Sequence, residues 1–539
     1  MVTGRRRQRG AALLALAAMV VLGTTWFVLS TVSSAAARSG AQVAHNARAL
    51  AEAKAALIAW VATRALDAAE DNPGRLPCPQ AWGDVGTANE GRAAAVCSNP
   101  IGWLPWRTLG LPRMLDAGGR QLWYVVSPGW HLPNASASLT INSDTPGQLT
   151  VDGRRAVALV IAPGAPLVIA PNPAQLAAGC SARSQSQALP ELKLALNPRD
   201  FLECYSGTTF NTAVVDNAVN RVSNDQVLAI SAAELVSALE AAIAKRIERD
   251  IAPALKGVYA GADWGLDASH PVFPFAAPFA NPGTSSFRGA AGTFRGLVPL
   301  HPAQGFVDFA ATPADASAFP STLLSQTCVW ESVEVRRCEG QYEKSARIEM
   351  SATFSNVAMG LRALDPARMQ VFARDMAGTS AWLPLPVSHT AKLNNDGSAT
   401  VTFGAMLPNT SATGWFRLRI ERAALADHPL LDPAHPATGW FVRNQWHRLV
   451  YYAIAPAHAA SGTHPRTCLV CLEIKNMEPA RQQRAILILA GRSLTGAPRP
   501  NGELADFLEG ANADASAGFE SRAASAGFND RIVVVDANP

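Results

Sequence analysis

A long apolar stretch near the N-terminus runs into a segment with only one apolar side. Residues 11–32 have no charged side chain, and further along Leu50, Leu57 and Val61 recur on one side of a helix among many alanines. Asp71-Asn72-Pro73-Gly74 is a strong helix stop. We therefore predict one helix of about 60 residues, about 90 Å long by its rise per residue. Its first half is apolar all round, and its second half packs on a globular body.

Short strands and a second helix are expected after this stop. Strands are predicted at Leu122–Ser127, Ser138–Asn142, Leu149–Val151, Ala156–Ala162 and in "NDQVLAI", which ends at Ile230. Ser231 and Glu234 form a capping box, and apolar residues then recur every fourth position from Leu235 to Leu255. This spacing predicts a helix, and Pro253 is expected to kink its last turns.

The apolar segments repeat within the chain. "RQLWYVVSPG" resembles "HRLVYYAIAP" at 447–456, and "RAVALVIAPGAPL" at 155–167 resembles "RAILILAGRSL" at 484–494. "NPRDFLECYSGTTF" followed by "NDQVLAI" resembles "LADFLEG" followed by "FNDRIVVV". Because the order is the same in both halves, we predict two copies of one module, a helix followed by a small sheet.

A β-rich segment interrupts the second copy. "SARIEMSATF", "RMQVFAR", "SATVTFGAML" and "GWFRLRIERA" alternate or form short apolar runs, and Asp396-Gly397 is typical of a hairpin turn. A small β-sandwich would fit this pattern. The predicted organisation is a leader at 1–10, a membrane span at 11–32, a first module at 33–230, a second module at 231–299 and 441–539, and an inserted β domain at 300–440.

The net charge indicates topology rather than nucleic-acid binding. The chain has 46 basic and 42 acidic side chains and a formal charge of +4, and Arg5, Arg6, Arg7 and Arg9 account for that excess. Four arginines before an apolar span long enough for a hydrocarbon core of about 30 Å place the N-terminus in the cytoplasm. The sequence therefore predicts a single-pass inner-membrane protein, with the bulk of the chain periplasmic or extracellular.

The cysteines agree with an exported chain. All eight fall into close pairs, which are Cys78 and Cys97, Cys180 and Cys204, Cys328 and Cys338, and Cys468 and Cys471. An even number of cysteines in local pairs is typical of disulfides formed in an oxidising compartment. The pairing is inferred from proximity alone, and eight buried free thiols are the alternative.

A basic leader ending in glycine, an apolar start to a very long helix and a β-rich body resemble type IV pilins and type II secretion pseudopilins. The resemblance implies cleavage by the prepilin peptidase after Gly10 and a new, N-methylated terminus at Ala11. It covers about residues 1–130. The implied fold class is α+β, with a long N-terminal membrane helix, two pilin-like helix-plus-antiparallel-sheet modules and an inserted all-β domain. The implied partners are inner-membrane lipid, the prepilin peptidase and other pilin-like subunits.

One position departs from the family pattern. Major pilins have a glutamate at the fifth mature position, where this chain has Ala15, and no acidic residue occurs in Ala11–Val32. A carboxylate in a membrane helix is costly without a partner. Its absence resembles the large tip pseudopilin and some minor pilins, and favours a tip or initiating subunit over a repeated filament subunit.

Two groups of polar residues are candidate metal sites. Asp84, Asn89 and Glu90 lie in a Gly-rich loop between two cysteines, and such oxygen ligands could hold calcium, although the spacing is not that of an EF-hand. The alternative is a polar loop closed by a disulfide. His447, His458 and His464 precede Cys468 and Cys471, which are zinc-type ligands, but a single C-x-x-C in an exported chain is more often a disulfide.

No motif indicates an enzyme. The sequence lacks G-x-S-x-G, H-E-x-x-H, a phosphate loop and a nucleotide fingerprint, and we expect no cofactor and no nucleic-acid partner. Trp103, Trp106, Trp123 and Tyr124 are expected in the core of the first module, with an exposed binding stripe as the alternative. The predicted function is that of a minor or tip-like component of a type IV pilus or type II secretion pseudopilus. The alternative is a membrane-anchored periplasmic adhesin or ligand-binding protein outside any filament.

Overall fold

The structure is a computed structural model of the 539-residue chain. It describes residues 40–131, 140–164, 201–202, 209–210, 225–257, 273–279, 290, 292–299, 309–312, 323–345, 347–355, 362–375, 381–394, 396, 398–409, 413–427, 430, 432–459, 471–478, 480, 482–499, 501–514 and 518–537. Two compact units divide the chain. The first comprises residues 1–60, 76–133 and 146–232, and the second comprises 61–75, 134–145 and 233–539.

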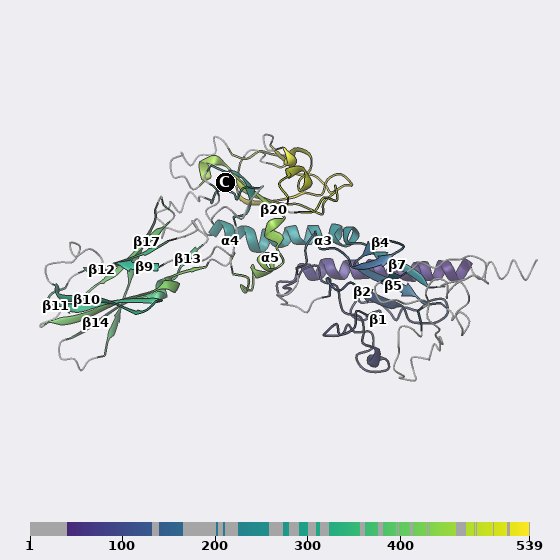
Figure 1. The fold of residues 1–539 in the computed structure, drawn as a ribbon, viewed down its shortest axis with the longest axis horizontal. Coiled ribbons are helices and arrows are strands. Elements are labelled where there is room, and N and C mark those ends of the chain that lie inside the picture. The colour runs from purple at the N-terminus through teal and green to yellow at the C-terminus, as the bar shows by residue number, and fades with distance from the viewer. Residues whose placement is uncertain are drawn as a thin grey trace, which may run out of the picture. The chain divides into compact units, whose positions relative to one another are not determined.

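The first unit contains most of a helix that is described over residues 40–65 and drawn in purple in Figure 1. Every third or fourth residue on one side, including Leu50, Ala53 and Leu57, is buried. The Lys54 ammonium donates a 2.9 Å hydrogen bond to the Ala229 carbonyl in the last strand of the adjoining sheet. This contact joins the amphipathic half of the helix to the sheet.

The sheet of the first unit has four antiparallel strands in the order β1-β2-β5-β7. Their bounds are Ile101–Trp103, Trp123–Val126, Ala158–Ala162 and Gln226–Ile230. Trp103 and Trp123 stack with ring centroids 4.2 Å apart, and Phe201 packs edge-on against Trp103 at 5.2 Å. A second, three-stranded sheet has the order β4-β3-β6, with bounds Arg154–Ala156, Leu149–Val151 and Thr209–Phe210.

The helix of the second unit has a π-helical turn in its middle. Helix α3, Ala232–Arg246, continues through the π turn Ile247–Ile251 into α4, Ala252–Gly257. Within the turn, the Ala252 N–H donates to the Ile247 carbonyl, five residues back. Pro253 has no N–H and its ring clashes with the carbonyl four residues earlier. A wider π turn before Pro253 accommodates this clash, and the helical backbone continues through it to Gly257.

Arg246 holds the segment that follows helix 40–65. Its side chain is 0% exposed, and its guanidinium donates to the carbonyls of Ala65 at 3.3 Å and Glu70 at 2.6 Å. The guanidinium also pairs with Asp250 at 3.2 Å and lies 4.5 Å above the Trp440 ring. It therefore satisfies carbonyls that the end of a helix leaves without partners.

The second unit has its own four-stranded antiparallel sheet, in the order β24-β22-β20-β8. The bounds of β8, β20, β22 and β24 are Arg295–Leu297, Val450–Ile454, Gln483–Leu489 and Arg531–Ala537. This is the strand order of the first sheet, β1-β2-β5-β7, when it is read in chain direction. The segments that repeat in the sequence lie at equivalent strands, β2 with β20, β5 with β22 and β7 with β24.

Several short elements complete this unit. Helix α5 spans Gly439–Arg443, and a parallel pair joins β21, Ile474–Lys475, to β23, Phe519–Glu520. Short 3-10 turns lie at Trp82–Asp84 in the first unit and at Pro366–Arg368, Arg422–Ala424, Trp446–Arg448, Pro456–His458, Leu504–Asp506 and Gly510–Ala513 in the second.

The chain between β8 and β20 forms a β-sandwich. One sheet has the order β10-β11-β18-β14-β15, with bounds Leu323–Ser332, Val335–Tyr342, Gly414–Glu421, Met369–Asp375 and Leu383–Leu385. The other has the order β16-β17-β12-β9, with bounds Ser388–Leu393, Ala399–Met406, Arg347–Phe354 and Phe309–Thr312. Strands β13, Arg362–Leu364, and β19, Leu425–Asp427, pair with each other. Alternate side chains of both sheets, such as Met350, Phe403 and Phe416, share one core.

The predicted fold class is wrong. The described residues are mostly β-strands in separate sheets with cores of their own, and they do not form a pilin fold. Helix 40–65 is amphipathic, as expected for the second half of the long helix, and no helix within the described ranges combines the length and apolar composition needed to cross a bilayer. The prediction grouped the expected strands into two pilin-like helix-plus-sheet modules, whereas the described strands form separate sheets. The apolar segment Ala11–Val32 lies outside the described residues.

Candidate functional site

Several residues singled out in the sequence lie outside the described residues. These are the leader positions Gly10, Ala11 and Ala15, the cysteines Cys180, Cys204 and Cys468, and His464. The leader cleavage and the family resemblance therefore stay predictions.

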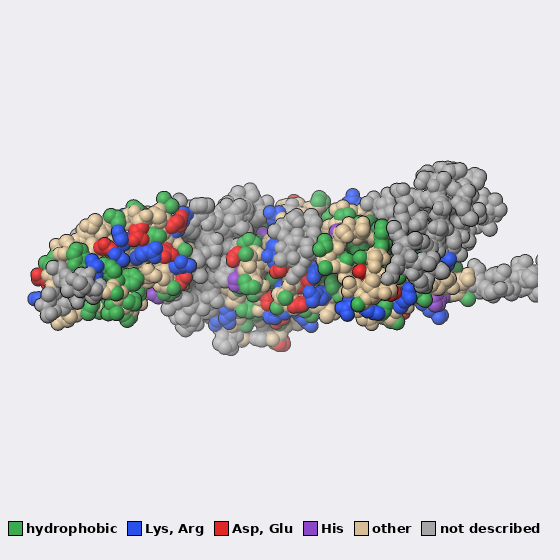
Figure 2. All heavy atoms as spheres, turned by 90° about the horizontal axis from the view of Figure 1, so that it is seen from below, with side chains coloured by type: hydrophobic (Ala, Val, Ile, Leu, Met, Phe, Trp, Pro, Cys, Tyr) green, Lys and Arg blue, Asp and Glu red, His purple; other side chains and the backbone are tan. Residues whose placement is uncertain are grey.

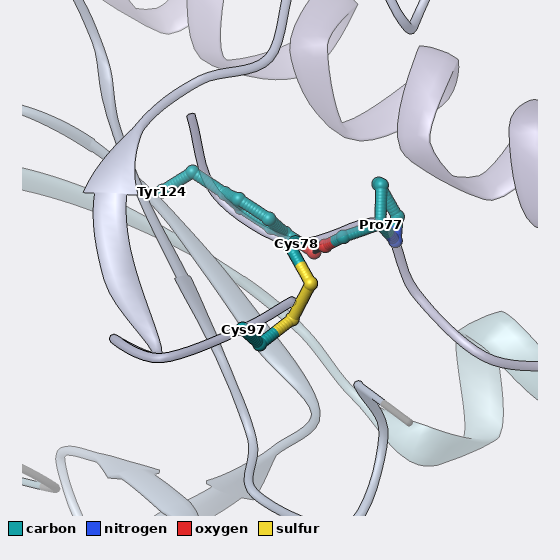
Figure 3. Close-up of a disulfide and its surroundings, with 4 residues drawn as sticks. All are labelled: Pro77, Cys78, Cys97 and Tyr124. Atoms are coloured by element: carbon teal, nitrogen blue, oxygen red, sulfur yellow. Dashed lines mark hydrogen bonds between the residues drawn. A yellow bond between two sulfur atoms is a disulfide. The ribbon is translucent and has the colours of Figure 1, made fainter. Parts of the chain in front are cut away.

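Cys78 and Cys97 form a disulfide in the first unit, with 5.2 Å between their Cα atoms. Figure 3 shows that it lies beside Tyr124 of β2. The Tyr124 hydroxyl donates to the Pro77 carbonyl at 3.1 Å, and complete burial raises the pKa of this phenol well above its usual value. The disulfide and this hydrogen bond fix the Pro-rich segment onto the sheet.

A second disulfide, Cys328 to Cys338, joins neighbouring strands of the sandwich. The two residues face each other in the β10–β11 register, with Cα atoms 4.1 Å apart. Cys471 is also disulfide-bonded, and no described cysteine is free.

The candidate calcium loop is held by its own hydrogen bonds. The Glu90 carboxylate accepts from the Gly86 N–H at 2.9 Å and lies 3.6 Å from the Arg113 guanidinium. Asp84 ends a 3-10 turn, and the Asn89 N–H donates to the Thr87 hydroxyl. Across the described parts of the chain, no group of three or more His, Cys, Asp or Glu side chains is placed to hold a metal ion.

The aromatic run of the first module is core rather than surface. Trp103, Trp123 and Tyr124 are at most 1% exposed, while Trp106 lies under the Arg107 guanidinium at 4.8 Å. The histidine-rich stretch likewise lies in the second module, where His458 is buried in the turn Pro456–His458. These buried residues pack between strands and do not form a binding surface.

The sandwich presents a face that sequence analysis missed. In β18 the alternation of "GWFRLRIE" buries every second residue from Gly414 and leaves Trp415, Arg417 and Arg419 on the outer side. Arg374 of β14 lies 4.5 Å from the Trp382 ring and 5.6 Å from the Trp415 ring, and Arg417 lies 4.2 Å from Trp382. Trp382 is therefore held by two guanidinium groups. The alternate arginines in the sequence of β18 were the one pattern from which this face could have been predicted.

Carboxylates complete this face. Arg417 is paired with Glu339 of β11, Arg419 lies 3.1 Å from Glu331 of β10, and Arg368 lies 2.9 Å from Glu421. Burial alone would raise the pKa of Glu421, but hydrogen bonds from Arg419 and Arg368 outweigh it and lower that pKa. In Figure 2, Lys and Arg side chains mix with Asp and Glu side chains over the part of the molecule that Figure 1 labels β10, β11 and β14.

The side chains of this face hold one another in place. Its carboxylates are paired with arginines, and the rings of Trp382 and Trp415 are already stacked by arginine. Exposed paired charges contribute little to stability individually. They do keep the side chains in fixed positions, as a recognition surface requires.

The second module pairs a buried carboxyl, Asp530, with the half-buried Glu509 where its sequence repeats that of the first. Asp530 is 4% exposed, and its carboxyl accepts from the Glu509 N–H at 2.9 Å and from the Asn512 amide at 3.0 Å. In return the Glu509 carboxylate accepts from the Asn529 N–H at 3.0 Å. Burial, followed by the nearby Glu509 carboxylate, raises the pKa of Asp530 to about 8. Asp225, the equivalent residue of the first module, is also buried, at 5% exposure.

Comparisons with known proteins add no family. No protein-family model matches the chain, and no curated protein or solved structure shows significant similarity to it.

Proposed function

We propose that the chain is an exported, membrane-anchored envelope protein that serves as a minor or tip-like component of a type IV pilus or type II secretion pseudopilus. The observation that carries the proposal is the leader, in which Arg5–Arg9 and Gly10 precede the charge-free segment Ala11–Val32. The missing acid at Ala15 favours a minor or tip-like role. The proposal rests on processing and assembly and does not require a pilin fold.

Two structural features support this proposal. Disulfides Cys78–Cys97 and Cys328–Cys338 are typical of proteins that fold in an oxidising compartment outside the cytoplasm. On helix 40–65, Ala47, Ala51, Ala55 and Ala59 are exposed at four-residue intervals. A row of small side chains lets a neighbouring helix approach closely, as helix-mediated assembly requires.

Leader processing is the first testable prediction. In cells with an active prepilin peptidase, mass spectrometry of the membrane-extracted chain should find Ala11 as the N-terminus, with N-methylation. Gly10→Val should abolish cleavage, because a bulky side chain then occupies the position before the cut bond. Gly4→Ala, a change at the other glycine of the leader, is the control and should be cleaved normally. A wild-type chain that still begins at Met1 or Val2 in these cells would contradict the proposal.

A second candidate function is ligand binding or adhesion by the sandwich. The observation that favours it is the outer face with Arg374, Trp382 and Arg417, on a domain with a core of its own. Replacing residues 309–427 with a short Gly/Ser linker should abolish attachment of cells to a surface. Leader cleavage and any pilus or secretion phenotype should be unchanged. Normal attachment by this variant, measured by counting adherent cells at equal chain abundance, would rule this candidate out.

A further inference from the structure

Strand β10 is a long edge strand of the sandwich in the described part of the chain. It has ten residues and forms one end of the five-stranded sheet, beyond β11. Most of its side chains are exposed, and Leu324 and Val329 are 49% and 39% exposed. An edge strand offers backbone groups to another strand unless something protects it.

The opposite edge of the same sheet is protected. Strand β15 has three residues, Leu383–Leu385, with Pro384 at its centre and Pro386 directly after it. Proline cannot donate to a further strand and is a common protection of sheet edges. Strand β10 has no proline and no lysine, and Glu331 is its only charged residue. Among the described residues, β10 therefore lacks the prolines that protect the opposite edge of this sheet.

The disulfide shows which backbone groups of β10 point outward. Cys328 and Cys338 face each other with Cα atoms 4.1 Å apart, the short separation of a pair that does not exchange backbone hydrogen bonds. The N–H and C=O of Cys328 therefore point away from β11. Because this direction alternates along a strand, those of Gln326 point the same way, whereas Thr327 bonds to Glu339 of β11.

We propose that β10 pairs antiparallel with β10 of a second copy of this chain, joining two sandwiches through a continuous sheet. In the register centred on Thr327, Gln326 of each copy exchanges backbone hydrogen bonds with Cys328 of the other. Residues 323–331 of the two strands then overlap, which uses almost all of β10. The centre of this register, residues 325–329, lies within the uninterrupted pairing of Ser325–Trp330 with β11, and the outer residues of the overlap lie at the two irregular ends of that pairing.

The side chains fit this self-pairing. The two Thr327 residues lie directly opposite each other, and Thr–Thr is a favourable cross-strand pair. Val329 faces Ser325, and the only charged residue of the strand, Glu331, faces Leu323. No like charges therefore meet, which argues for a second copy as the occupant. The contact goes beyond the proposed function and does not depend on leader processing, because β10 lies far from the leader in the chain.

The test uses the full-length chain in detergent. Size-exclusion chromatography with light scattering should show a concentration-dependent dimer, and hydrogen exchange should show protection of the peptide covering β10 at high concentration. Gln326→Pro removes an N–H that points away from β11, so the sandwich should stay folded while dimerisation weakens by about tenfold or more. Gln326→Ala keeps that N–H and is the matched control, which should still dimerise.

A pair of oppositely charged variants distinguishes weaker pairing from a folding defect caused by the proline. Thr327→Glu places two carboxylates opposite each other, and Thr327→Lys places two ammonium groups there, so each variant alone should dimerise about tenfold more weakly. An equal mixture of the two should restore the dimer, which no folding defect can explain. A wild-type chain that is monomeric at all concentrations overturns the proposal. The same holds if β10 becomes protected only when a strand of another protein binds to it. A dimer that survives both Gln326→Pro and Thr327→Glu overturns it as well.

Discussion

Replacing Arg246 with leucine should lower the opening free energy of the region around α3 by about 4 kcal/mol. The Arg246 side chain is fully buried, and it donates to the carbonyls of Ala65 and Glu70. Leucine fills similar space but cannot donate, so these carbonyls would lose a hydrogen-bond partner. The buried Asp250 carboxylate would also lose one of its cationic partners.

Hydrogen exchange in increasing denaturant measures this effect locally, which suits a chain with several separate cores. The peptides to follow are those of α3 and of residues 61–75. Arg249→Leu is the matched control on the same helix, because the Arg249 side chain is 46% exposed although it also contacts Asp250 and donates to the Leu66 carbonyl. It should cost less than about 1 kcal/mol. Equal losses of opening free energy in the two variants would show that neither the burial of Arg246 nor its bonds to the two carbonyls stabilises this region.

We expect the second module of the wild-type chain to become less stable as the pH rises. Replacing Asp530 with asparagine should remove most of this pH dependence. The pKa of Asp530 is raised from 3.8 to about 8 in the folded chain, so the fold favours the protonated carboxyl. Its contribution is fully present below about pH 4 and is lost as the pH rises towards 8. The loss amounts to several kcal/mol, since each unit of pKa difference corresponds to about 1.4 kcal/mol. Asparagine stays neutral and can donate to the Glu509 carboxylate at any pH.

The measurement is the opening free energy of β22 and β24 by hydrogen exchange, corrected for intrinsic rates, between pH 5 and pH 8.5. The wild-type chain should lose stability across this range, and Asp530→Asn should lose much less. Glu509→Gln should also flatten the dependence, because the Glu509 carboxylate is a cause of the raised pKa of Asp530. Glu503→Gln, at an exposed carboxylate of the same connection, is the control and should keep the wild-type slope. A slope unchanged by Asp530→Asn would show that other groups cause it.

Local patterns predicted part of this structure. The four-residue spacing from Leu235 to Leu255 corresponds to a buried helix side, and the alternation in "GWFRLRIE" corresponds to strand β18. The repeated segments of the sequence correspond to strands at equivalent places in two sheets. These features depend on neighbours within a few residues, where periodicity reports burial directly.

Features that depend on distant contacts were not predictable in this way. Arg246 appears in the sequence as one more basic residue near a helix end, yet its partner carbonyls belong to a segment far earlier in the chain. The reciprocal bonds of Glu509 and Asp530, and the stacking of Trp382 on Arg417 from another strand, have the same origin. The fold-class prediction failed for a related reason, because a leader and a helix do not determine how many independent sheets follow.

The shared strand order has a consequence for how the chain folds as it is synthesised. Two sheets with similar strands and the same order can exchange partners while both are incomplete, a known route to misfolding in chains with internal repeats. The first sheet is built from strands between Ile101 and Ile230, which all precede the strands of the second sheet in the chain. The second must wait for β20, because residues 298–449 separate β8 from it. The inserted sandwich thus delays β20, β22 and β24 until the first sheet has formed. The order of synthesis therefore helps each strand to pair within its own sheet.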